Sequence, residues 1–535
     1  MLKAVRVDPG VAPADAGPGA VAGAIAFETK DVDDLLASGL SFGGLLSTEY
    51  QSQGDTIASS LALFGRRGGF EYLAYGKIAD GGVRDDGDGV DIVGSGTDVV
   101  SGLAKVAYNG ADGSRVELSY ERVEDDAQRP LRADFAGLED AFETRTYALE
   151  RENLVLSYTG GGGNAIWNPR VQLAFNATDL YTAPLPGRTD AYSGTSNSLT
   201  GKIENDFTLQ AGLVKAGIDF YLDKTDITGE DGTEFFAEEK ADNLGLYVQG
   251  EFDVADRARV TSGLRYDFQT FEGVDGTEYD NSGLSVNLAG DYDVTDQVTL
   301  SAGASRVWGG IALAESFLFD PGWVYPDEIE PVTSENYYIG ATAQFGAFDL
   351  NAKVFQTNVE NARTLYDSTT DRFGASPGLT SALDTKGFEI GGRYNWNAGF
   401  VRVAYAKVDS KIDGNDADSY AGRYLTTPLG DNLVIEAVHS LSAIDMTLGA
   451  TAQITFDEEV DYRFGEARTL EGYKVVDIFA EYRPAGYDGL TIRGTIGNLL
   501  DETYSQRASY GQEFEGVAAL NEPGRNVKIS ASYEF

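Results

Sequence analysis

The sequence predicts an all-β protein, specifically a transmembrane antiparallel β-barrel of about 22 strands. Apolar and polar residues alternate along most of the chain, which gives each segment one apolar and one polar face, as in a β-strand. No run of about 18 apolar residues occurs, so a transmembrane helix is not expected. Short and long connections alternate between the segments, as they do in bacterial outer-membrane barrels.

The last segment of the chain, residues 527–535, shows the alternation most clearly. Its apolar residues occupy every second position, namely Val527, Ile529, Ala531, Tyr533 and Phe535. A strand that is apolar on one face and ends on an aromatic residue suits the rim of an outer-membrane barrel, although the last strand of a soluble β-sandwich shows the same alternation. In the barrel, we expect Tyr533 and Phe535 to face outward near the periplasmic rim and Lys528 to face the lumen.

The connections between the expected strands predict the order of the barrel. Two similar short turns, at 252–257 and 292–297, lie 40 residues apart, and each is followed by a strand. Further short turns are found at 344–347, 396–399, 440–443 and 484–487. One strand out, a longer loop and one strand back separate successive turns, so residues 244–535 contain about 13 strands and residues 38–243 about nine more. We expect closure by pairing of the first strand, near 42–50, with the last.

The composition excludes several classes of function. Lysine and arginine number 41 against 85 aspartate and glutamate residues, for a net charge of −44. A nucleic-acid partner is therefore not expected, because phosphate binding needs an excess of basic residues, whereas local arginines can still receive small anions. Cysteine is absent and His439 is the one histidine, which excludes disulfides, cysteine-based zinc sites and thiol nucleophiles. No Gly-x-Ser-x-Gly motif lies near His439, so we do not expect an enzyme.

Short motifs follow one another in a recognisable order along the chain. They lie at 246–252, 263–267, 331–340, 386–390, 497–504, 523–527 and 533–535. This ordered set resembles the TonB-dependent outer-membrane receptors. The resemblance implies a barrel that lies among the lipid and lipopolysaccharide of a Gram-negative outer membrane and imports a scarce nutrient. It further implies a ferric siderophore as the expected ligand and TonB as the source of energy. A plugless, porin-like passive channel formed by the barrel alone is the alternative.

The N-terminal residues depart from this family pattern. Residues 5–7, 17–25 and 29–31 resemble only the closing segment of the plug that fills such barrels. We therefore expect residues 1–37 to be the remnant of a plug domain and residues 38–535 to be the transmembrane barrel. By resemblance, TonB is a partner only if the rest of the plug, with the box that contacts TonB, is present in the full protein.

The stretch 308–334 is the first candidate for ligand binding. Its candidate ligand-binding residues are Trp308, Glu315, Trp323 and Tyr325. The aromatic rings are expected either to stack on a siderophore or another planar ligand, or to pack the loop and join the aromatic girdle of the membrane interface. By resemblance, residues 355–385 and 500–525 also belong to the extracellular region that binds the ligand.

Haem is less favoured than a siderophore as the ligand of this region. By resemblance, haem receptors of this family are expected to use histidines on the extracellular side. The stretch 308–334 contains no histidine, and His439 precedes a short turn that we place on the periplasmic side. Tyrosine can also ligate haem iron, so haem stays an alternative. We expect no resident cofactor.

Acidic residues gather in a glycine-rich stretch, Asp85–Asp91. Carboxylates on a flexible turn are the ligands that calcium prefers, but the spacing of a known calcium loop and its closing glutamate are absent. We interpret the stretch as a solvated extracellular loop and expect no metal site.

Overall fold

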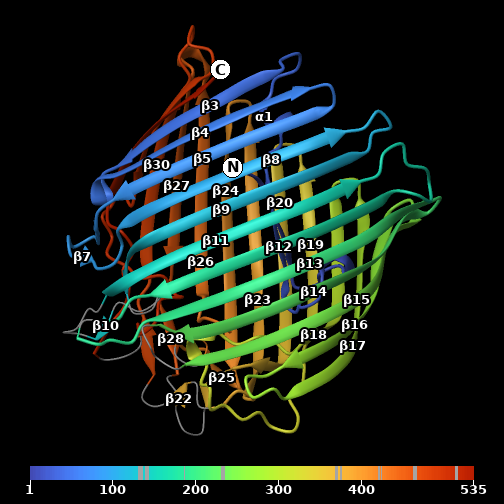
Figure 1. The fold of residues 1–535 in the computed structure, drawn as a ribbon. Helices are drawn as coiled ribbons and strands as arrows, with labels where there is room; N and C mark the ends of the chain where they lie inside the picture. The colour runs from blue at the N-terminus through green and yellow to red at the C-terminus, as the bar shows by residue number, and fades with distance from the viewer. Residues whose placement is uncertain are drawn as a thin grey trace.

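The computed structural model describes the whole chain apart from residues 131–136, 139–143, 186, 231–234, 365, 368–371, 374–375, 420–421, 423–424, 462–466 and 513–515. Nearly all of the regular structure is β-strand, and 22 long strands close into one barrel (Figure 1). No helix in the described part of the chain is long and apolar enough to cross a membrane.

The barrel strands follow one another in chain order, and each pairs antiparallel with its neighbours. Their bounds are β3 (Phe42–Gln51), β4 (Thr56–Arg67), β5 (Phe70–Gly81), β8 (Thr97–Asn109), β9 (Arg115–Pro130), β11 (Thr144–Thr159), β12 (Pro169–Thr182), β13 (Tyr192–Leu209), β14 (Gly212–Gly229), β15 (Phe236–Ala255), β16 (Ala258–Glu272), β17 (Glu278–Thr295), β18 (Val298–Gly310), β19 (Val332–Phe345), β20 (Phe348–Arg363), β23 (Thr380–Trp396), β24 (Gly399–Ile412), β26 (Gly430–Leu441), β27 (Met446–Thr455), β30 (Tyr473–Tyr482), β31 (Leu490–Gly497) and β33 (Asn526–Glu534). Thirteen of them lie from β15 onward, so the predicted strand count is confirmed in both halves of the chain.

Short elements lie in the connections. The minor strands are β6 (Arg84–Asp85), β7 (Asp91–Ile92), β10 (Gly137–Leu138), β21 (Tyr366–Asp367), β22 (Arg372–Phe373), β25 (Asn415–Asp416), β28 (Glu458–Val460), β29 (Arg468–Leu470) and β32 (Val517–Ala518). The short 3-10 helices among them are η2 (Gln53–Asp55), η3 (Ser316–Leu318) and η4 (Ser442–Ile444).

Pairing of β3 with β33 closes the barrel. The register joins Leu45 to Glu534 at one end and Gln51 to Lys528 at the other. Closure leaves the sheet without an edge, which matters because an unpaired backbone N–H or C=O in lipid costs several kcal/mol. The predicted pairing of the first strand with the last is confirmed.

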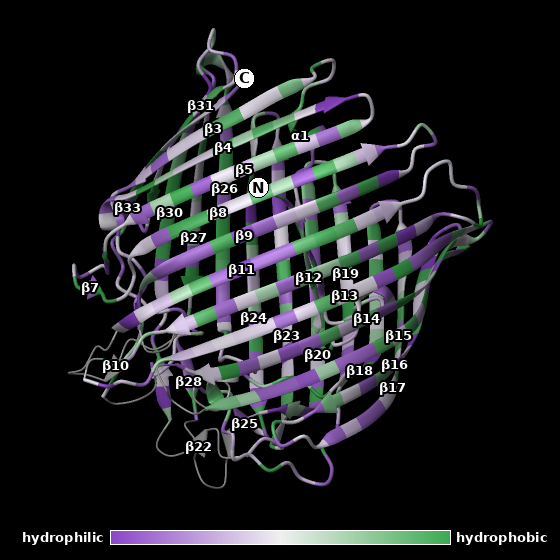
Figure 2. Cartoon of the chain, in the orientation of Figure 1, coloured by the Kyte–Doolittle hydropathy of each residue, from purple (hydrophilic) through white to green (hydrophobic). Residues whose placement is uncertain are grey.

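Successive side chains of each strand face opposite sides of the wall, and β15 illustrates this. Leu244, Leu246 and Val248 are 46%, 44% and 40% exposed, whereas Tyr247 and Gln249 are buried at 5% and 3%. The exposed apolar residues face lipid and the intervening residues face the lumen. Figure 2 shows the resulting bands of hydrophobic and hydrophilic residues along the strands.

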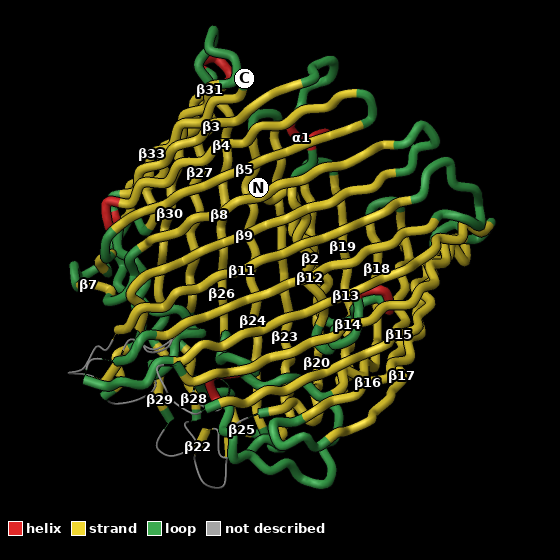
Figure 3. Tube along the Cα trace, viewed as in Figure 1, coloured by secondary structure: helices red, strands yellow, loops and turns green. Residues whose placement is uncertain are grey.

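Short and long connections alternate around the barrel (Figure 3). The turns at 256–257, 296–297 and 346–347 are the short kind, whereas the loops 311–331 and 498–525 are the long kind. The long loops gather at one end of the barrel, and β3 begins and β33 ends at the opposite end. This arrangement is that of short periplasmic turns and long extracellular loops, as the sequence predicts.

Phe535 closes the seam between β33 and β3. Its backbone N–H donates to the carbonyl oxygen of Gly44 at 3.0 Å, and the N–H of Gly44 donates back to the carbonyl oxygen of Phe535 at 2.9 Å. The ring lies over Gly44, where an added Cβ would come within 2.3 Å of it. Phe535 and Tyr533 are exposed on the outer face, so their predicted orientation is confirmed.

The N-terminal segment, residues 1–41, lies inside the barrel (Figure 1). It consists of a hairpin and two short helices, namely β1 (Leu2–Pro9), η1 (Ala14–Ala16), β2 (Gly23–Thr29) and α1 (Val32–Leu35). Asp15 forms an ion pair of 2.8 Å with Lys215 of β14, and the N–H of Ala14 donates to the side chain of Gln249 at 2.8 Å. Both partners belong to the lumen face of the wall.

Two further contacts hold the same segment elsewhere on the wall. Asp31 forms an ion pair of 2.6 Å with the buried Lys105 of β8, and the carbonyl oxygen of Val21 accepts a hydrogen bond of 3.0 Å from Asn336 of β19. The segment therefore occupies part of the lumen between distant strands. The first barrel strand begins at Phe42, and the assignment of residues 1–37 to a plug domain stays a prediction.

Replacing Phe535 by alanine is expected to lower the yield of folded barrel in the outer membrane severalfold. The variant loses the ring that packs over Gly44 at the seam, whereas Lys528→Gln changes only the lumen face of the same strand. Heat-modifiable mobility on gels of isolated outer membranes measures the folded fraction. Equal folded fractions for the two variants would contradict this role of Phe535.

Deleting residues 1–41 is expected to raise the single-channel conductance of the barrel in a planar bilayer. The deleted hairpin and helices occupy part of the lumen, so their removal widens the path for ions. The point variant Lys3→Gln, which leaves the segment in place, serves as the control. A deletion variant that is folded but conducts like the control would show that other chain segments limit the pore.

Candidate functional site

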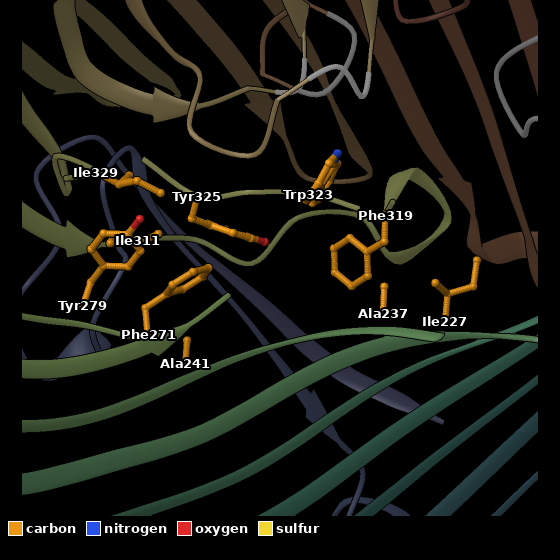
Figure 4. Close-up of a cluster of buried hydrophobic side chains, with 10 residues drawn as sticks. All are labelled: Ile227, Ala237, Ala241, Phe271, Tyr279, Ile311, Phe319, Trp323, Tyr325 and Ile329. Atoms are coloured by element: carbon orange, nitrogen blue, oxygen red, sulfur yellow. The ribbon is translucent and has the colours of Figure 1, made fainter. Parts of the chain in front are cut away.

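The loop between β18 and β19, residues 311–331, turns into the barrel and buries its apolar side chains against β14 to β17. The buried cluster, drawn in Figure 4, comprises Ile227, Ala237, Ala241, Phe271, Tyr279, Ile311, Phe319, Trp323, Tyr325 and Ile329. Edge-to-face contacts join Trp323 to Phe319 and to Tyr325, with ring centroids 5.6 Å and 6.4 Å apart. The loop is therefore packed like a small hydrophobic core.

Glu239, on β15, is the polar centre of this cluster. Its side chain is fully buried and faces Arg363 of β20, whose two terminal nitrogens donate to it at 2.6 Å and 2.7 Å. The hydroxyl of Tyr325 and the backbone N–H of Ala314 also donate to this carboxylate. The guanidinium lies over the ring of Phe271, 5.3 Å from its centroid. These bonds satisfy the buried charges and fix the loop to the wall.

Gln269, on β16, fixes the start of the same loop. Its amide oxygen accepts the N–H of Ile311 at 2.7 Å, and its amide nitrogen donates to the carbonyl oxygen of Ile311 at 3.1 Å. The same nitrogen donates to the hydroxyl of Tyr221 at 2.8 Å. Near the other end of the loop, the hydroxyl of Tyr279 donates to the carbonyl oxygen of Pro326. Both ends of the loop are thus tied to side chains of the wall.

The four candidate residues from the sequence lie in different environments. Trp323 and Tyr325 are 5% and 6% exposed within the cluster. Trp308 lies near the end of β18 and is buried against Gly283, where an added Cβ would come within 2.1 Å of its ring. Glu315 is exposed and stays outside the cluster. The structure brings Trp323 and Tyr325 together, in the arrangement expected if they pack the loop; ligand binding by any of the four stays a prediction.

Tyr325 is placed as a hydrogen-bond donor. Its hydroxyl proton is engaged by Glu239. Burial, together with the negative charge of Glu239, raises the pKa of the Tyr325 hydroxyl well above its ordinary value. The phenolate, which is the form that ligates ferric iron, is therefore disfavoured at this position.

His439 lies on β26 beside the turn to β27, at the periplasmic end of the barrel. The indole N–H of Trp396 donates to its Nδ1 atom at 3.0 Å, and the two ring centroids are 6.0 Å apart. The predicted periplasmic position of His439 is therefore confirmed.

A pocket of about 380 Å³ opens at the extracellular mouth. It lies between the loop 82–96, the adjoining ends of β9 and β11, and residues 520–523. Its polar lining includes Arg84, Arg129 and Tyr147. This volume falls in the range of small-molecule sites, and two arginines in one pocket are notable in a chain of net charge −44.

Tyr147, on β11, contacts Arg145 at the edge of this pocket. Its hydroxyl oxygen accepts a bond of 3.2 Å from the guanidinium of Arg145, which also lies over the ring at 5.2 Å from the centroid. Because Tyr147 lines this pocket and Tyr325 is buried, Tyr147 is the better placed of the two phenols for binding iron.

A larger hollow of about 1100 Å³ lies on the wall itself. Its lining includes the outward side chains Leu288, Ile339 and Val354, which are 57%, 71% and 62% exposed. These side chains face lipid, so we do not assign the hollow to the transported ligand.

The acidic stretch Asp85–Asp91 is folded by its own carboxylates. Asp86 accepts the backbone N–H groups of Asp88 and Val90, each at 3.0 Å, and its second oxygen accepts a bond of 2.8 Å from Asn521. In the described part of the chain, no group of three or more histidine, aspartate or glutamate residues is arranged to hold a metal ion.

The mouth pocket was not predicted from the sequence. Arg84, Arg129 and Tyr147 come from neighbouring strands and loops in chain order, and closure of the barrel adds residues 520–523 to them. The sequence did contain a signal for this pocket, because Arg84 and Arg129 are basic residues next to acidic stretches of the chain. Which of the scattered arginines converge is decided by the sheet order alone.

The closed barrel, its long loops and its occupied lumen define an outer-membrane transport protein. The sequence matches the family described as TonB dependent receptor-like, beta-barrel, over residues 90–499. The chain therefore belongs to the TonB-dependent receptors and is located in the outer membrane of a Gram-negative bacterium.

Among its relatives, the heme transporter BhuA of Brucella abortus is 29% identical over 556 residues, which cover 100% of this chain and 80% of that protein. The FrpB iron transporter from Neisseria meningitidis has a similar structure, with a TM-score of 0.87, 18% identity and coverage of 100% of this chain and 88% of that one. The Serratia marcescens hemophore receptor HasR, in complex with HasA and heme, gives a TM-score of 0.75, 16% identity and coverage of 100% and 87%. At these identities the two structures show a shared fold.

Removing one partner of the buried Glu239–Arg363 pair is expected to release the loop 311–331. Glu239→Gln leaves the guanidinium buried and uncompensated, at a local cost of about 3–5 kcal/mol. Hydrogen exchange read by mass spectrometry should show lost protection in this loop and unchanged protection in β3 to β5. The double variant Glu239→Leu/Arg363→Met leaves no unpaired charge and should recover much of the protection of this loop. Unchanged exchange in Glu239→Gln would refute the assignment.

Proposed function

We propose that this outer-membrane receptor imports haem and that TonB supplies the energy. The observation that carries the proposal is the identity of 29% to a heme transporter over 100% of this chain. Membership of the TonB-dependent receptors supports the coupling to TonB. Haem thereby has more support as the ligand than a ferric siderophore.

The packing of the loop 311–331 is consistent with this choice. A siderophore bound by aromatic stacking needs open ring faces. Trp323 and Tyr325 are buried against one another and against Phe319. The aromatic rings for which the sequence suggested stacking on a siderophore therefore pack against other side chains of the protein.

We place the iron ligand of the receptor at Tyr147. The residue lines the mouth pocket, and its oxygen accepts the hydrogen bond of Arg145. Arg84 in the same pocket offers a positive charge to the carboxylates of haem. The single histidine, His439, is held at the periplasmic end by Trp396. Tyrosine ligation of haem iron is known chemistry and needs no histidine.

A passive channel is the alternative function. Residues 1–41 and the loop 311–331 both occupy the lumen, which favours a gated receptor over an open pore. The conductance measurement on the deletion variant separates the two functions.

Haemin titration of the purified receptor, followed by the Soret absorption band, tests the proposed ligand. Tyr147→Phe is expected to weaken haemin binding by more than about tenfold, because even outer-shell partners of metal ligands contribute this much. Tyr325→Phe is the matched control and should bind haemin like the unaltered protein. Failure of the unaltered receptor to bind haemin, with tight binding of a ferric siderophore, would overturn the haem proposal. Equal haemin affinity in both variants would move the iron ligand away from Tyr147.

A further inference from the structure

Arg507 is a buried cation in the extracellular loop 498–525, and only 5% of its surface is exposed. Its Nη2 group donates to the carbonyl oxygen of Phe456 at 2.5 Å. Its Nε and Nη1 groups are also buried, and neither has a hydrogen-bond partner among the residues that the structure describes. Folded proteins rarely leave buried donors unsatisfied, because burial removes the water that otherwise binds them.

The positive charge of Arg507 is uncompensated as well. Burial lowers the pKa of its guanidinium, and the neighbouring carboxylates of Asp457 and Glu458 do not restore it. Tyr473 also lies nearby and packs on Tyr504, with ring centroids 4.5 Å apart. Burial raises the pKa of Tyr504 to about 12, so this phenol carries no negative charge at neutral pH. In the described part of the chain, the carboxylates of Asp457 and Glu458 lie near Arg507, but neither forms an ion pair with its guanidinium.

Other buried arginines of this chain are paired. Arg265, 2% exposed, contacts Asp267 at 2.7 Å, and Arg363 contacts Glu239 at 2.6 Å. No ion pair of Arg507 is present in the described part of the chain. A buried, unpaired guanidinium is expensive, and two free donors beside it are the complement of an anionic acceptor.

We infer that Arg507 anchors a binding site for a carboxylate group carried by a small extracellular molecule. A carboxylate supplies both the missing charge and acceptors for the Nε and Nη1 donors. Two sources have this chemistry, namely the carboxylate side chains of a porphyrin and the carboxylates of an iron chelate such as ferric citrate. Both donors are buried in this structure, so a carboxylate reaches them only when the chain around Arg507 moves.

The Arg507 site is separate from the mouth pocket that contains Tyr147. Arg507 does not line that pocket, which takes residues 520–523 from the same loop. The loop 498–525 therefore contributes residues both to the mouth pocket and to the surroundings of Arg507. The carboxylate site does not require that the transported ligand be haem.

Binding of protoporphyrin IX and of its dimethyl ester to the full chain in detergent tests the site. The two probes differ only in their carboxylates, and neither contains iron. The unaltered protein is expected to bind the free acid about tenfold more tightly than the ester, as a charge-assisted hydrogen bond predicts. Arg507→Met, and Arg507→Gln as a second variant, should lower this preference severalfold and leave the affinity for the ester unchanged.

Arg525→Met is the matched control from the same loop. Arg525 pairs with Asp501 at 3.3 Å and donates to the carbonyl oxygen of Leu499 at 3.0 Å, so its loss disturbs the loop without removing the proposed anchor. This control should keep the preference for the free acid. A variant that binds both probes more weakly to the same degree would indicate a structural role for Arg507 and overturn the inference.

A preference for the acid that is unchanged in Arg507→Met also overturns the inference. If neither porphyrin binds the unaltered protein, ferric citrate is the second probe. Binding of ferric citrate that falls about tenfold in Arg507→Met supports the site with a chelate as its source. If ferric citrate does not bind the unaltered protein, or binds Arg507→Met equally well, the inference is overturned. The haem proposal is judged separately, by the Soret response of Tyr147→Phe.

Discussion

The requirement that every backbone N–H and C=O in lipid find a partner within the protein is the constraint on which this structure depends. The antiparallel ladder meets it from β3 round to β33, and the pairing of these two strands removes the last free edge. Once the ladder is closed, alternate side chains necessarily face lipid and lumen. The apolar residues that are exposed on β15 are therefore a consequence of the hydrogen bonds. The packing of Phe535 over Gly44 completes the same seam.

Closure with 22 strands creates a second requirement, because so wide a barrel encloses a lumen that wall side chains cannot fill. The protein fills part of it with its own chain. Residues 1–41 are held by ion pairs to the wall, and the loop 311–331 brings in an apolar cluster with Glu239 and Arg363 at its centre. Buried charges are acceptable there because each meets its partner with short hydrogen bonds. The aromatic residues of this loop consequently support the loop itself.

Two tyrosines show how the surroundings set the chemistry of a side chain. Tyr325 donates its proton to a buried carboxylate, which keeps the phenol neutral. Tyr147 accepts a hydrogen bond from Arg145 at the rim of a pocket. The first arrangement strengthens a loop, and the second leaves a phenol oxygen beside a guanidinium at the rim of a pocket. The pocket at the mouth brings together Arg84, Arg129 and Glu522, and Arg129 is paired with Asp125 at 2.6 Å.

The sequence by itself determined the barrel. Strand number, the short turns, the closing pair and the orientation of Phe535 all follow from period-two alternation and turn spacing, which are local properties of the chain. The site was decided only by tertiary structure. Glu239 and Arg363 are 124 residues apart, and Arg507 reaches a carbonyl oxygen 51 residues away. The order of strands in the closed sheet decides which residues become neighbours. It therefore decides whether Trp323 and Tyr325 contact a ligand or each other, and whether a buried arginine has a partner. Local patterning carries no information about contacts between distant residues, so the sequence identified aromatic residues in the loop without indicating that they are buried.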